Sequence, residues 1–345
     1  MRRSLRLMIG GRRSFTASAM PKAVKIVEVG PRDGLQNEKA IIPTQSKIQL
    51  IRKLQDAGLT RIEIGSFVSP KYVPQMADTS EIVKALIKND NTATPSSSSL
   101  SVLTPNLKGF KMANELGVKE IAIFGSASEA FSKKNINCSI EESLKKFKIV
   151  CDHAKLHNMK VRGYVSCVLG CPYEGHVEPT KVAQLASHLL DLGCFEVSLG
   201  DTIGVGNPSS TAELLDTCLQ HIDANQLAVH FHDTYAMSIA NIVTALEKGI
   251  TVIDSSVSGL GGCPYAKGAS GNVATEDVIY LLDGLGIQHG VDMDKLRDAQ
   301  RYIDDVLKRS SASKVARARN ATDSDDNNCS GGSGSTESSI EQAIA

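Results

Sequence analysis

Runs of β-branched residues alternate with amphipathic stretches along most of this chain, and this alternation limits the possible folds more than any other feature. Eight short runs have the composition of buried strands, at 23–29, 61–64, 100–103, 120–124, 160–166, 195–199, 227–231 and 251–256. Segments with helical spacing of apolar residues separate most of them, at 45–57, 79–87, 107–116, 139–158, 180–192, 211–221, 237–248 and 274–285. Because strand-helix units follow one another in this way, we expect an α/β fold that closes into a (β/α)8 TIM barrel.

A doubly wound open sheet would show the same alternation of strands and helices. The even spacing of the units, and the polar residues at the strand ends described below, favour the closed barrel. One more amphipathic segment at 293–307 predicts a short C-terminal helical extension. We therefore expect the barrel domain with this helix to cover residues 23–309.

The chain beyond the barrel region has a different composition. From residue 310, and most clearly over 322–345, polar residues and glycine predominate. Such a segment cannot bury enough apolar surface to offset the entropy of ordering, so we expect residues 310–345 to form a low-complexity, mostly disordered tail. A polar insertion at 89–99 likewise predicts a surface loop.

The N-terminal segment is rich in arginine and serine and contains no acidic residue. Its basic residues are Arg2, Arg3, Arg6, Arg12 and Arg13. An acid-free leader that can form an amphipathic helix is typical of a mitochondrial transit peptide, whereas a basic disordered start is the simpler alternative. We predict that residues 1–22 direct the protein to the mitochondrial matrix.

Composition also excludes several classes of function. No apolar run reaches the roughly 18–20 residues that a membrane-spanning helix requires. The formal net charge is zero, tryptophan is absent and aromatic residues make up 4% of the chain, so nothing indicates a nucleic-acid-binding surface. The 8 cysteines are widely scattered, which favours free thiols over a disulfide framework.

The segment LAVHFHDTYAM places two histidines at the end of a predicted strand. Side chains alternate along a strand, so His230 and His232 face the same side. A polar strand end that bonds to nearby loops is the simpler interpretation. In a barrel, however, Asp33 and Asn272 follow other strands and would converge with the histidines on the same rim. Oxygen and imidazole ligands with open positions suit Mg²⁺ or Mn²⁺ better than structural zinc.

Further polar residues follow other predicted strands and complete the candidate site. Arg32 could donate to a developing oxyanion, although a surface salt bridge with Glu38 is the alternative. Glu63 and Asp201 lie at the ends of the second and sixth strands. Cys263 lies in a glycine-rich loop that could close over the site, where its thiol could exchange a proton instead of simply packing.

Several segments together resemble the 3-hydroxy-3-methylglutaryl-CoA lyase family of barrel metallo-lyases. They include VGPRDGLQNEK, SFVSPKYVPQMAD, RGYVSCVLGCPYEG, SLGDTIGVG, HFHDTY and GLGGCPYAKGASGNVATED. The similarity extends over residues 25–316. It implies a divalent-metal-dependent enzyme that cleaves 3-hydroxy-3-methylglutaryl-CoA to acetyl-CoA and acetoacetate, as in ketogenesis and leucine degradation, and that forms a homodimer.

The resemblance also implies roles for the candidate residues. The metal ligands of the family fall on Asp33, His230, His232 and Asn272. The arginine that contacts the substrate carbonyl falls on Arg32, the catalytic cysteine on Cys263, and two acidic site residues on Glu63 and Asp201. Either Asp33 or His230 would remove the hydroxyl proton before the carbon–carbon bond breaks, and the sequence leaves that choice open.

The chain departs from the family pattern at one position. Animal mitochondrial members carry a regulatory cysteine at a subunit contact shortly after the SKVA segment, whereas this chain has Asn320 there and Cys329 further along. Thiol regulation by that route is therefore not expected. The chain also ends in AIA, which is not the peroxisomal tripeptide.

Three other functions are compatible with all or part of this pattern. A related synthase would condense an acyl-CoA with a 2-keto acid, but such enzymes generally lack the cysteine loop around Cys263. A lyase for a longer, branched 3-hydroxyacyl-CoA would share every motif. A catalytically inactive barrel that serves as a scaffold would bind metal without turnover.

Overall fold

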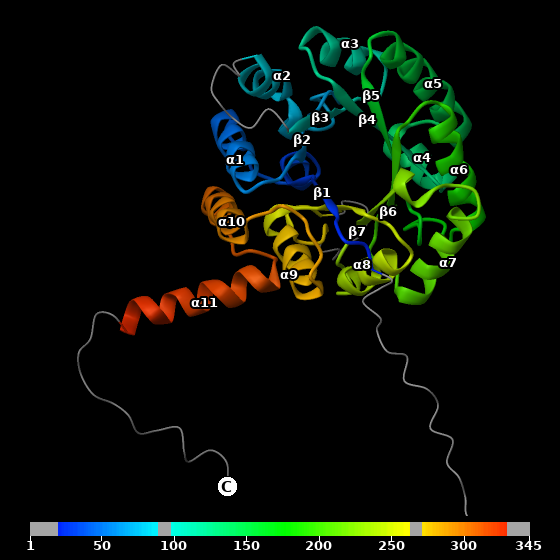
Figure 1. The fold of residues 1–345 in the computed structure, drawn as a ribbon. Coiled ribbons are helices and arrows are strands. Elements are labelled where there is room, and N and C mark those ends of the chain that lie inside the picture. The colour runs from blue at the N-terminus through cyan, green and yellow to red at the C-terminus, as the bar shows by residue number, and fades with distance from the viewer. Residues whose placement is uncertain (1–19, 89–97, 263–270, 330–345) are drawn as a thin grey trace, which may run out of the picture.

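The computed structural model describes residues 20–88, 98–262 and 271–329. Eight parallel strands close into one barrel in sequence order, with β8 hydrogen-bonded to β1 (Figure 1). The strands are β1 (Lys25–Glu28), β2 (Arg61–Ser66), β3 (Ser99–Leu103), β4 (Glu120–Ser126), β5 (Lys160–Ser166), β6 (Glu196–Asp201), β7 (Leu227–Phe231) and β8 (Val252–Ser255). The predicted TIM barrel is confirmed.

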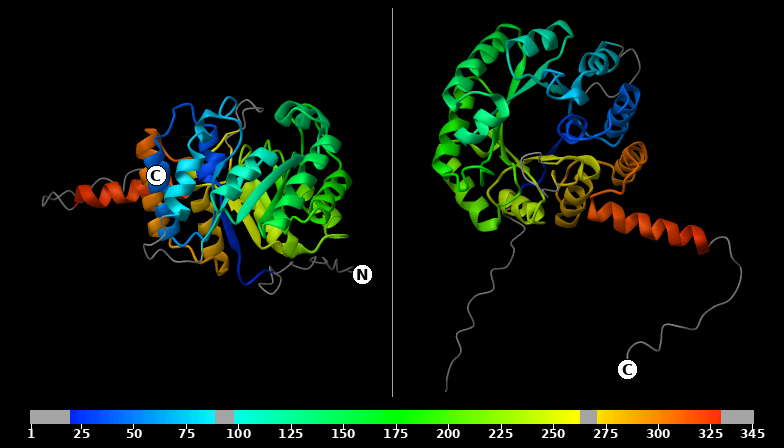
Figure 2. Two further views of the ribbon diagram at one scale, coloured as in Figure 1. Left: turned by 90° about the horizontal axis from the view of Figure 1, so that it is seen from above. Right: turned by 180° about the vertical axis from the view of Figure 1, so that it is seen from behind.

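Helices surround the barrel on its outer side (Figures 1 and 2). They are α1 (Thr44–Asp56), α2 (Thr79–Val83), α3 (Leu107–Glu115), α4 (Glu129–Ile136), α5 (Ile140–Leu156), α6 (Pro179–Asp191), α7 (Pro208–Cys218), α8 (Ser238–Glu247), α9 (Thr275–Leu285) and α10 (Met293–Leu307). A further helix, α11 (Lys314–Cys329), extends beyond them. Single turns also occur at η1 (Gly30–Gly34), η2 (Pro74–Met76), η3 (Lys84–Lys88), η4 (Ala224–Gln226) and η5 (Val257–Gly259). The turns η1 and η5 follow β1 and β8 and shape the rim of the barrel.

Local capping signals explain where several helices begin. Before α5, the Ser139 hydroxyl accepts a hydrogen bond from the Glu142 amide, and the Glu142 carboxylate accepts one from the Ser139 amide. Asn207 and Ser210 form the same reciprocal arrangement at the start of α7. These side chains satisfy amide groups that have no partner in the first turn of a helix.

The main apolar core lies between the strands and the surrounding helices. Side chains alternate along a strand, so Ile26 and Ile253 face the helices while their neighbours face the barrel interior. A small apolar cluster fills part of the interior, formed by Val27, Val29, Ala228 and Val252. A second interior cluster is formed by Leu103, Ala122 and Tyr164. The interior also holds buried polar and charged residues.

The observed strands agree with the predicted ones to within two residues at each end, but α4 was not predicted. Ser128 caps it by accepting from the Phe131 amide, and Asn137 ends it with a left-handed backbone at φ 51°. Its sequence, EAFSKKNI, is short and mostly polar. It therefore carries too little apolar periodicity to reveal a helix.

The C-terminal segment corrects our expectation of a mostly disordered tail from residue 310. Residues Lys314–Cys329 form α11, which projects away from the barrel (Figures 1 and 2). Asp277 of α9 anchors its start, because the carboxylate accepts from the Ser313 hydroxyl and from the amides of Lys314 and Val315. Composition did not reveal this helix because the residue that anchors it lies far away in the sequence.

Residues 1–19, 89–97, 263–270 and 330–345 lie outside the described part of the chain. The transit peptide, most of the loop at 89–99 and the end of the tail therefore stay predictions. Within the described ranges, no helix is both long and apolar enough to cross a membrane. Six cysteines are buried free thiols, as their spacing predicted: Cys138, Cys151, Cys167, Cys171, Cys194 and Cys218.

Candidate metal centre and active site

Three potential metal ligands meet where β1 and β7 end at the carboxyl-terminal side of the barrel. One ligand atom from each of Asp33, His230 and His232 lies within 4.8 Å of the other two. Asp33 belongs to the turn η1 directly after β1, whereas His230 lies in β7 and His232 follows it. The rule that parallel strands bring their carboxyl ends together therefore placed these residues correctly.

Asn272 joins this group from the segment that precedes α9. Its Nδ2 donates to Asp33 Oδ2 at 2.9 Å, and its backbone pairs with His232 in an isolated bridge. Nε2 of His230 lies 3.9 Å from the same Asp33 oxygen, and the two histidine rings are 5.4 Å apart. All four predicted ligands therefore lie together, with the Asn272 Oδ1 atom as the oxygen that the amide could offer to a cation.

Electrostatics keep the group in the protonation states that metal ligands need. Burial alone would raise the pKa of Asp33, but Arg32, His230 and His232 lower it below its usual range. Burial, together with the neighbouring His230, lowers the pKa of His232 to about 4. An ionised carboxylate and a neutral imidazole both present free lone pairs. This donor set fits a divalent cation with open coordination positions.

Arg32 lies beside the candidate ligands and is almost fully buried. Its NH1 atom donates to Asp33 Oδ1 at 2.6 Å, and its Nε atom donates to Glu63 Oε1. Burial alone would lower the pKa of Arg32, but the two carboxylates raise it, so the guanidinium stays charged. Glu38 instead pairs with Arg309, at 3.0 Å. The alternative of an exposed Arg32–Glu38 salt bridge is therefore wrong.

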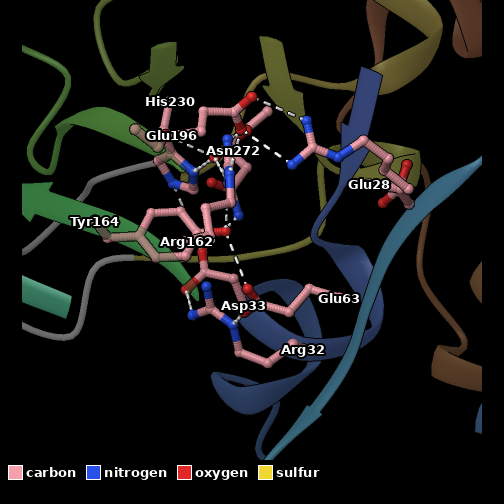
Figure 3. Close-up of polar contacts among 12 residues, drawn as sticks. Glu28, Arg32, Asp33, Glu63, Arg162, Tyr164, Glu196, His230 and Asn272 are labelled. Atoms are coloured by element: carbon pink, nitrogen blue, oxygen red, sulfur yellow. Dashed lines mark hydrogen bonds and ion pairs between the residues drawn. The ribbon is translucent and has the colours of Figure 1, made fainter. Parts of the chain in front are cut away.

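Glu63 holds Arg32 from the interior of the barrel. Its Oε1 accepts from Arg32, and its Oε2 accepts from the Tyr164 hydroxyl at 3.0 Å. Figure 3 shows Arg32, Asp33 and Glu63 gathered beside Tyr164. The structure therefore brings Glu63 into the site as a residue that orients the guanidinium.

Four interior residues that our sequence analysis did not identify continue this network: Arg162, Tyr164, Ser198 and Asp254. Arg162 NH2 donates to Asp254 Oδ1 at 2.7 Å, and Arg162 NH1 donates to the Tyr164 hydroxyl at 2.8 Å. Asp254 Oδ2 lies 3.2 Å from Nδ1 of His230. The sequence does contain an indication of this network, because Arg162 and Asp254 are charged residues within runs that otherwise have the composition of buried strands.

Asp201 is held by backbone amides at the carboxyl end of β6. It is fully buried at the end of β6, and its carboxylate accepts from the amides of Val205 and Gly206 at 3.2 and 2.8 Å. Burial raises its pKa, although these hydrogen bonds oppose the shift. The contacts of Asp201 shape the loop between β6 and α7, and its predicted catalytic role stays a prediction.

Glu28 connects three segments behind the candidate site. One carboxylate oxygen accepts from the amides of Gly30 and Val257 at 2.8 and 2.9 Å, and the other accepts from the Thr275 hydroxyl at 2.6 Å. These partners lie in η1, in η5 and at the start of α9. Burial raises the pKa of Glu28 to about 7, which the hydrogen bonds only partly counteract. In Figure 3 it lies apart from the other labelled residues.

Cys263 lies outside the described residues, so its catalytic role stays a prediction. The glycines that flank the undescribed segment have a clear structural role. A Cβ atom at Gly261 would lie 2.6 Å from Asn272 Nδ2, and one at Gly271 would lie 2.6 Å from the Gly261 carbonyl carbon. Both have positive φ, at 134° and 87°. Only glycine permits such a close approach to a candidate ligand with this backbone.

Known proteins share this sequence and architecture. A family model described as HMGL-like matches residues 23–303. The mitochondrial hydroxymethylglutaryl-CoA lyase of Bos taurus is 56% identical over 303 residues, which cover 88% of this chain and 91% of the relative. The lyase of Arabidopsis thaliana, also named mitochondrial, is 56% identical over 88% of this chain, which spans 64% of that relative's length.

Solved structures agree with these relatives. The hydroxymethylglutaryl-CoA lyase from Pseudomonas aeruginosa is 54% identical and superposes with a TM-score of 0.84, covering 88% of this chain and 99% of that one. An HMG-CoA lyase from Acinetobacter baumannii, 34% identical with a TM-score of 0.80 over 89% and 97% of the two chains, was solved in complex with coenzyme A and 3-methylmalate. The present chain therefore belongs to the HMGL-like family, among the hydroxymethylglutaryl-CoA lyases.

Proposed function

We propose that this chain cleaves 3-hydroxy-3-methylglutaryl-CoA to acetyl-CoA and acetoacetate, the carbon–carbon lyase step used in ketogenesis and leucine degradation. Family membership supports this activity. The observation that carries it is the convergence of Asp33, His230 and His232 within 4.8 Å of one another. Buried Arg32 lies in direct contact with Asp33.

The proposed cofactor is a divalent cation, Mg²⁺ or Mn²⁺, held by Asp33, His230, His232 and Asn272. When bound, such a cation supplies Lewis-acid chemistry that makes the tertiary hydroxyl of the substrate more acidic. Oxygen-rich ligation with imidazole nitrogen suits these cations.

Residues of the chain supply the proton transfers and the stabilisation of charge that the cleavage requires. A base, either Asp33 or His230, accepts the proton of the tertiary hydroxyl. The oxygen lone pair forms the ketone of acetoacetate while the bond between C2 and C3 of the acyl group breaks, and its electron pair becomes the enolate of acetyl-CoA. Arg32 donates to the enolate oxygen, and one such donor is typically worth about 3 kcal/mol. Protonation of the enolate carbon completes the acetyl-CoA.

Glu63 and Asp201 support this chemistry in different ways. Glu63 fixes the guanidinium of Arg32 through Nε, and Asp33 holds NH1. The NH2 group is the proposed donor to a substrate oxygen. Asp201 sets the β6–α7 loop beside the site. Both are therefore proposed to position other groups during catalysis.

Cys263 is the proposed donor of the proton to the enolate carbon. Replacing a general acid typically lowers the rate by 10²- to 10⁴-fold, so Cys263→Ala should lose kcat and keep metal affinity. Cys329→Ala is the matched control and should keep wild-type activity. If Cys263→Ala retains more than half of the turnover, the cysteine has a structural role and another group supplies the proton.

The direct test is incubation of the full chain with 3-hydroxy-3-methylglutaryl-CoA and Mg²⁺, followed by an enzymatic assay of acetoacetate. Acetoacetate formation that stops on chelation and returns with added Mg²⁺ is expected. Release of free CoA from acetyl-CoA and a 2-keto acid, without acetoacetate formation, would support the synthase instead. A preference for longer branched thioesters would redefine the substrate.

We also propose that the protein acts in the mitochondrial matrix as a homodimer. The acid-free, arginine-rich residues 1–20 and the naming of several relatives as mitochondrial support the location. A fusion of residues 1–25 to a reporter should enter mitochondria, and cytosolic retention would contradict the proposal. Light scattering of the purified chain should give twice the monomer mass.

A further inference from the structure

We propose that Asp254 sets the tautomer and orientation of His230, and that Arg162 and Ser198 hold Asp254 in place for this purpose. This would make Asp254 a positioning residue of the metal centre. The inference rests on the proposed function only in taking His230 as a ligand. Its first observation is the register of the barrel, in which His230 of β7 is paired directly with Asp254 of β8.

Register partners on neighbouring strands point to the same face of a sheet. Outward-facing Val229 and Ile253 belong to the core beneath the helices, so His230 and Asp254 both face the barrel interior. The Asp254 side chain is fully buried. Its Oδ2 atom lies 3.2 Å from Nδ1 of His230, within hydrogen-bond distance.

The other contacts of Asp254 determine the direction of that hydrogen bond. Arg162 donates to both carboxylate oxygens, at 2.7 and 3.0 Å, and the Ser198 hydroxyl donates to Oδ2 at 2.8 Å. A carboxylate held by a two-pronged guanidinium and a hydroxyl donor is the ionised form, which can only accept. The hydrogen between Asp254 and His230 therefore lies on Nδ1.

A neutral imidazole that carries its hydrogen on Nδ1 has its lone pair on Nε2. Nε2 of His230 is the nitrogen on the side of Asp33, 3.9 Å from its Oδ2 atom. The contact with Asp254 therefore leaves the lone pair on the nitrogen that faces the other ligands. Removal of such an outer partner typically weakens metal binding by about 10- to 100-fold.

The chain offers a matched control on the other side of Arg162. Glu196 also pairs with this arginine, accepting from Nε at 2.7 Å, and it accepts from Arg61 at 3.0 Å. Asp254→Asn and Glu196→Gln therefore each remove one negative charge from Arg162. Only the first removes the partner of His230.

The test begins with the tautomer itself, measured without metal on wild-type protein labelled with ¹⁵N-histidine at alkaline pH. Long-range ¹H–¹⁵N correlation spectra distinguish the protonated ring nitrogen from the free one, and the His230→Gln variant identifies the His230 signals. We expect hydrogen on Nδ1. Hydrogen on Nε2 would overturn the proposal whether or not the variants fold, and independently of any assay for acetoacetate.

Mn²⁺ titration of the two folded variants completes the test. Asp254→Asn should bind Mn²⁺ about 10- to 100-fold more weakly than wild type and should lose the Nδ1-protonated form of His230. Glu196→Gln should keep the tautomer and stay within about twofold of the wild-type Mn²⁺ affinity, against that expected loss. Equal losses of affinity in both variants, with the tautomer unchanged, would show a general structural effect and would contradict the proposal.

Discussion

The barrel interior and the layer between strands and helices both bury carboxylates near the candidate site, but their charges are balanced differently. Inside the barrel, Asp254 and Glu196 pair with Arg162, and at its rim Asp33 pairs with Arg32. In the layer outside, Glu28 and Glu276 form no ion pair with a basic side chain among the described residues; they accept from amides and hydroxyls instead. We call these sets the arginine-paired carboxylates (Asp33, Glu196, Asp254) and the glutamate pair (Glu28, Glu276).

The two sets respond to burial in opposite directions. Burial acts to raise the pKa in both, yet arginine lowers the pKa of each arginine-paired carboxylate below its usual range. In the glutamate pair burial prevails, and the pKa rises to about 7 for Glu28 and about 8 for Glu276. Glu63 does not follow this division, because burial raises its pKa although it bonds to Arg32.

This difference separates two tasks at one end of the same barrel. A carboxylate that keeps its charge without solvent can attract a cation and fix a neighbouring imidazole. A carboxyl group that retains a proton near neutral pH can connect segments such as η1, η5 and α9 without a second charge.

Removal of Arg162, which pairs with both Asp254 and Glu196, should reduce the free energy of unfolding most. Arg162→Met leaves Asp254 and Glu196 buried with one cation fewer, and breaking a buried pair by removal of one partner typically costs about 3–5 kcal/mol. The free energy of unfolding, measured by urea denaturation at pH 7.5, should fall by that amount. A loss below about 1 kcal/mol, the range of exposed salt bridges, would show that the network is weakly coupled to stability.

The glutamate pair should make stability depend on pH in the opposite sense to a salt-bridged carboxylate. The folded-state pKa of Glu276 is raised from 4.5 to about 8, so its contribution is present below pH 4.5 and is lost as the pH rises through 8. Replacement by Gln removes this titration. Urea denaturation of Glu276→Gln between pH 5 and pH 8 should therefore show a decline shallower by roughly 1.4 kcal/mol per pH unit. Parallel curves for variant and wild type would contradict the assignment.

The smallest expected effects come from removing one hydroxyl donor from a carboxylate of each set, with the variants Ser198→Ala and Thr275→Val. Ser198 donates to Asp254 at 2.8 Å, and Thr275 donates to Glu28 at 2.6 Å. Hydrogen bonds to charged groups contribute about 1.5–3 kcal/mol, whereas neutral ones contribute about 0.5–1.5 kcal/mol. At pH 6, Ser198→Ala should therefore reduce the unfolding free energy more than Thr275→Val does. The reverse order would mean that the two sets do not differ in charge.

The sequence was sufficient to predict the barrel because strand and helix signals there are local. Each run of β-branched residues is bounded by an amphipathic segment, so the parallel barrel follows from their order. The convergence of the candidate ligands also followed, since Asp33, His230 and Asn272 lie at the carboxyl end of a strand or in the segment that follows it, and the fold brings these ends together. Short α4 and the start of α11 depend on caps and distant contacts, which periodicity does not record.

The network of Arg162, Tyr164 and Asp254 inside the barrel was not predicted, because it also depends on contacts between residues far apart in the sequence. Arg162 and Asp254 lie within strands rather than after them, and only the closed barrel brings their side chains together. The ends of the predicted strands indicated Glu63 but not its partner Tyr164. A charged residue within an otherwise apolar strand is a usable signal, since burial requires that it be paired.

The central claim is that Asp33, kept ionised by its neighbours, helps to build a cation site, whereas the glutamate pair does not. Calorimetric titration of metal-free protein with Mn²⁺ tests it most directly, with wild type, Asp33→Asn and Glu276→Gln measured under identical conditions. We predict one ion bound per chain in wild type and in Glu276→Gln, and an affinity at least tenfold lower in Asp33→Asn, in line with the loss typical of a weakened metal site. Saturable binding of equal affinity in all three proteins, or none in wild type, would contradict the account.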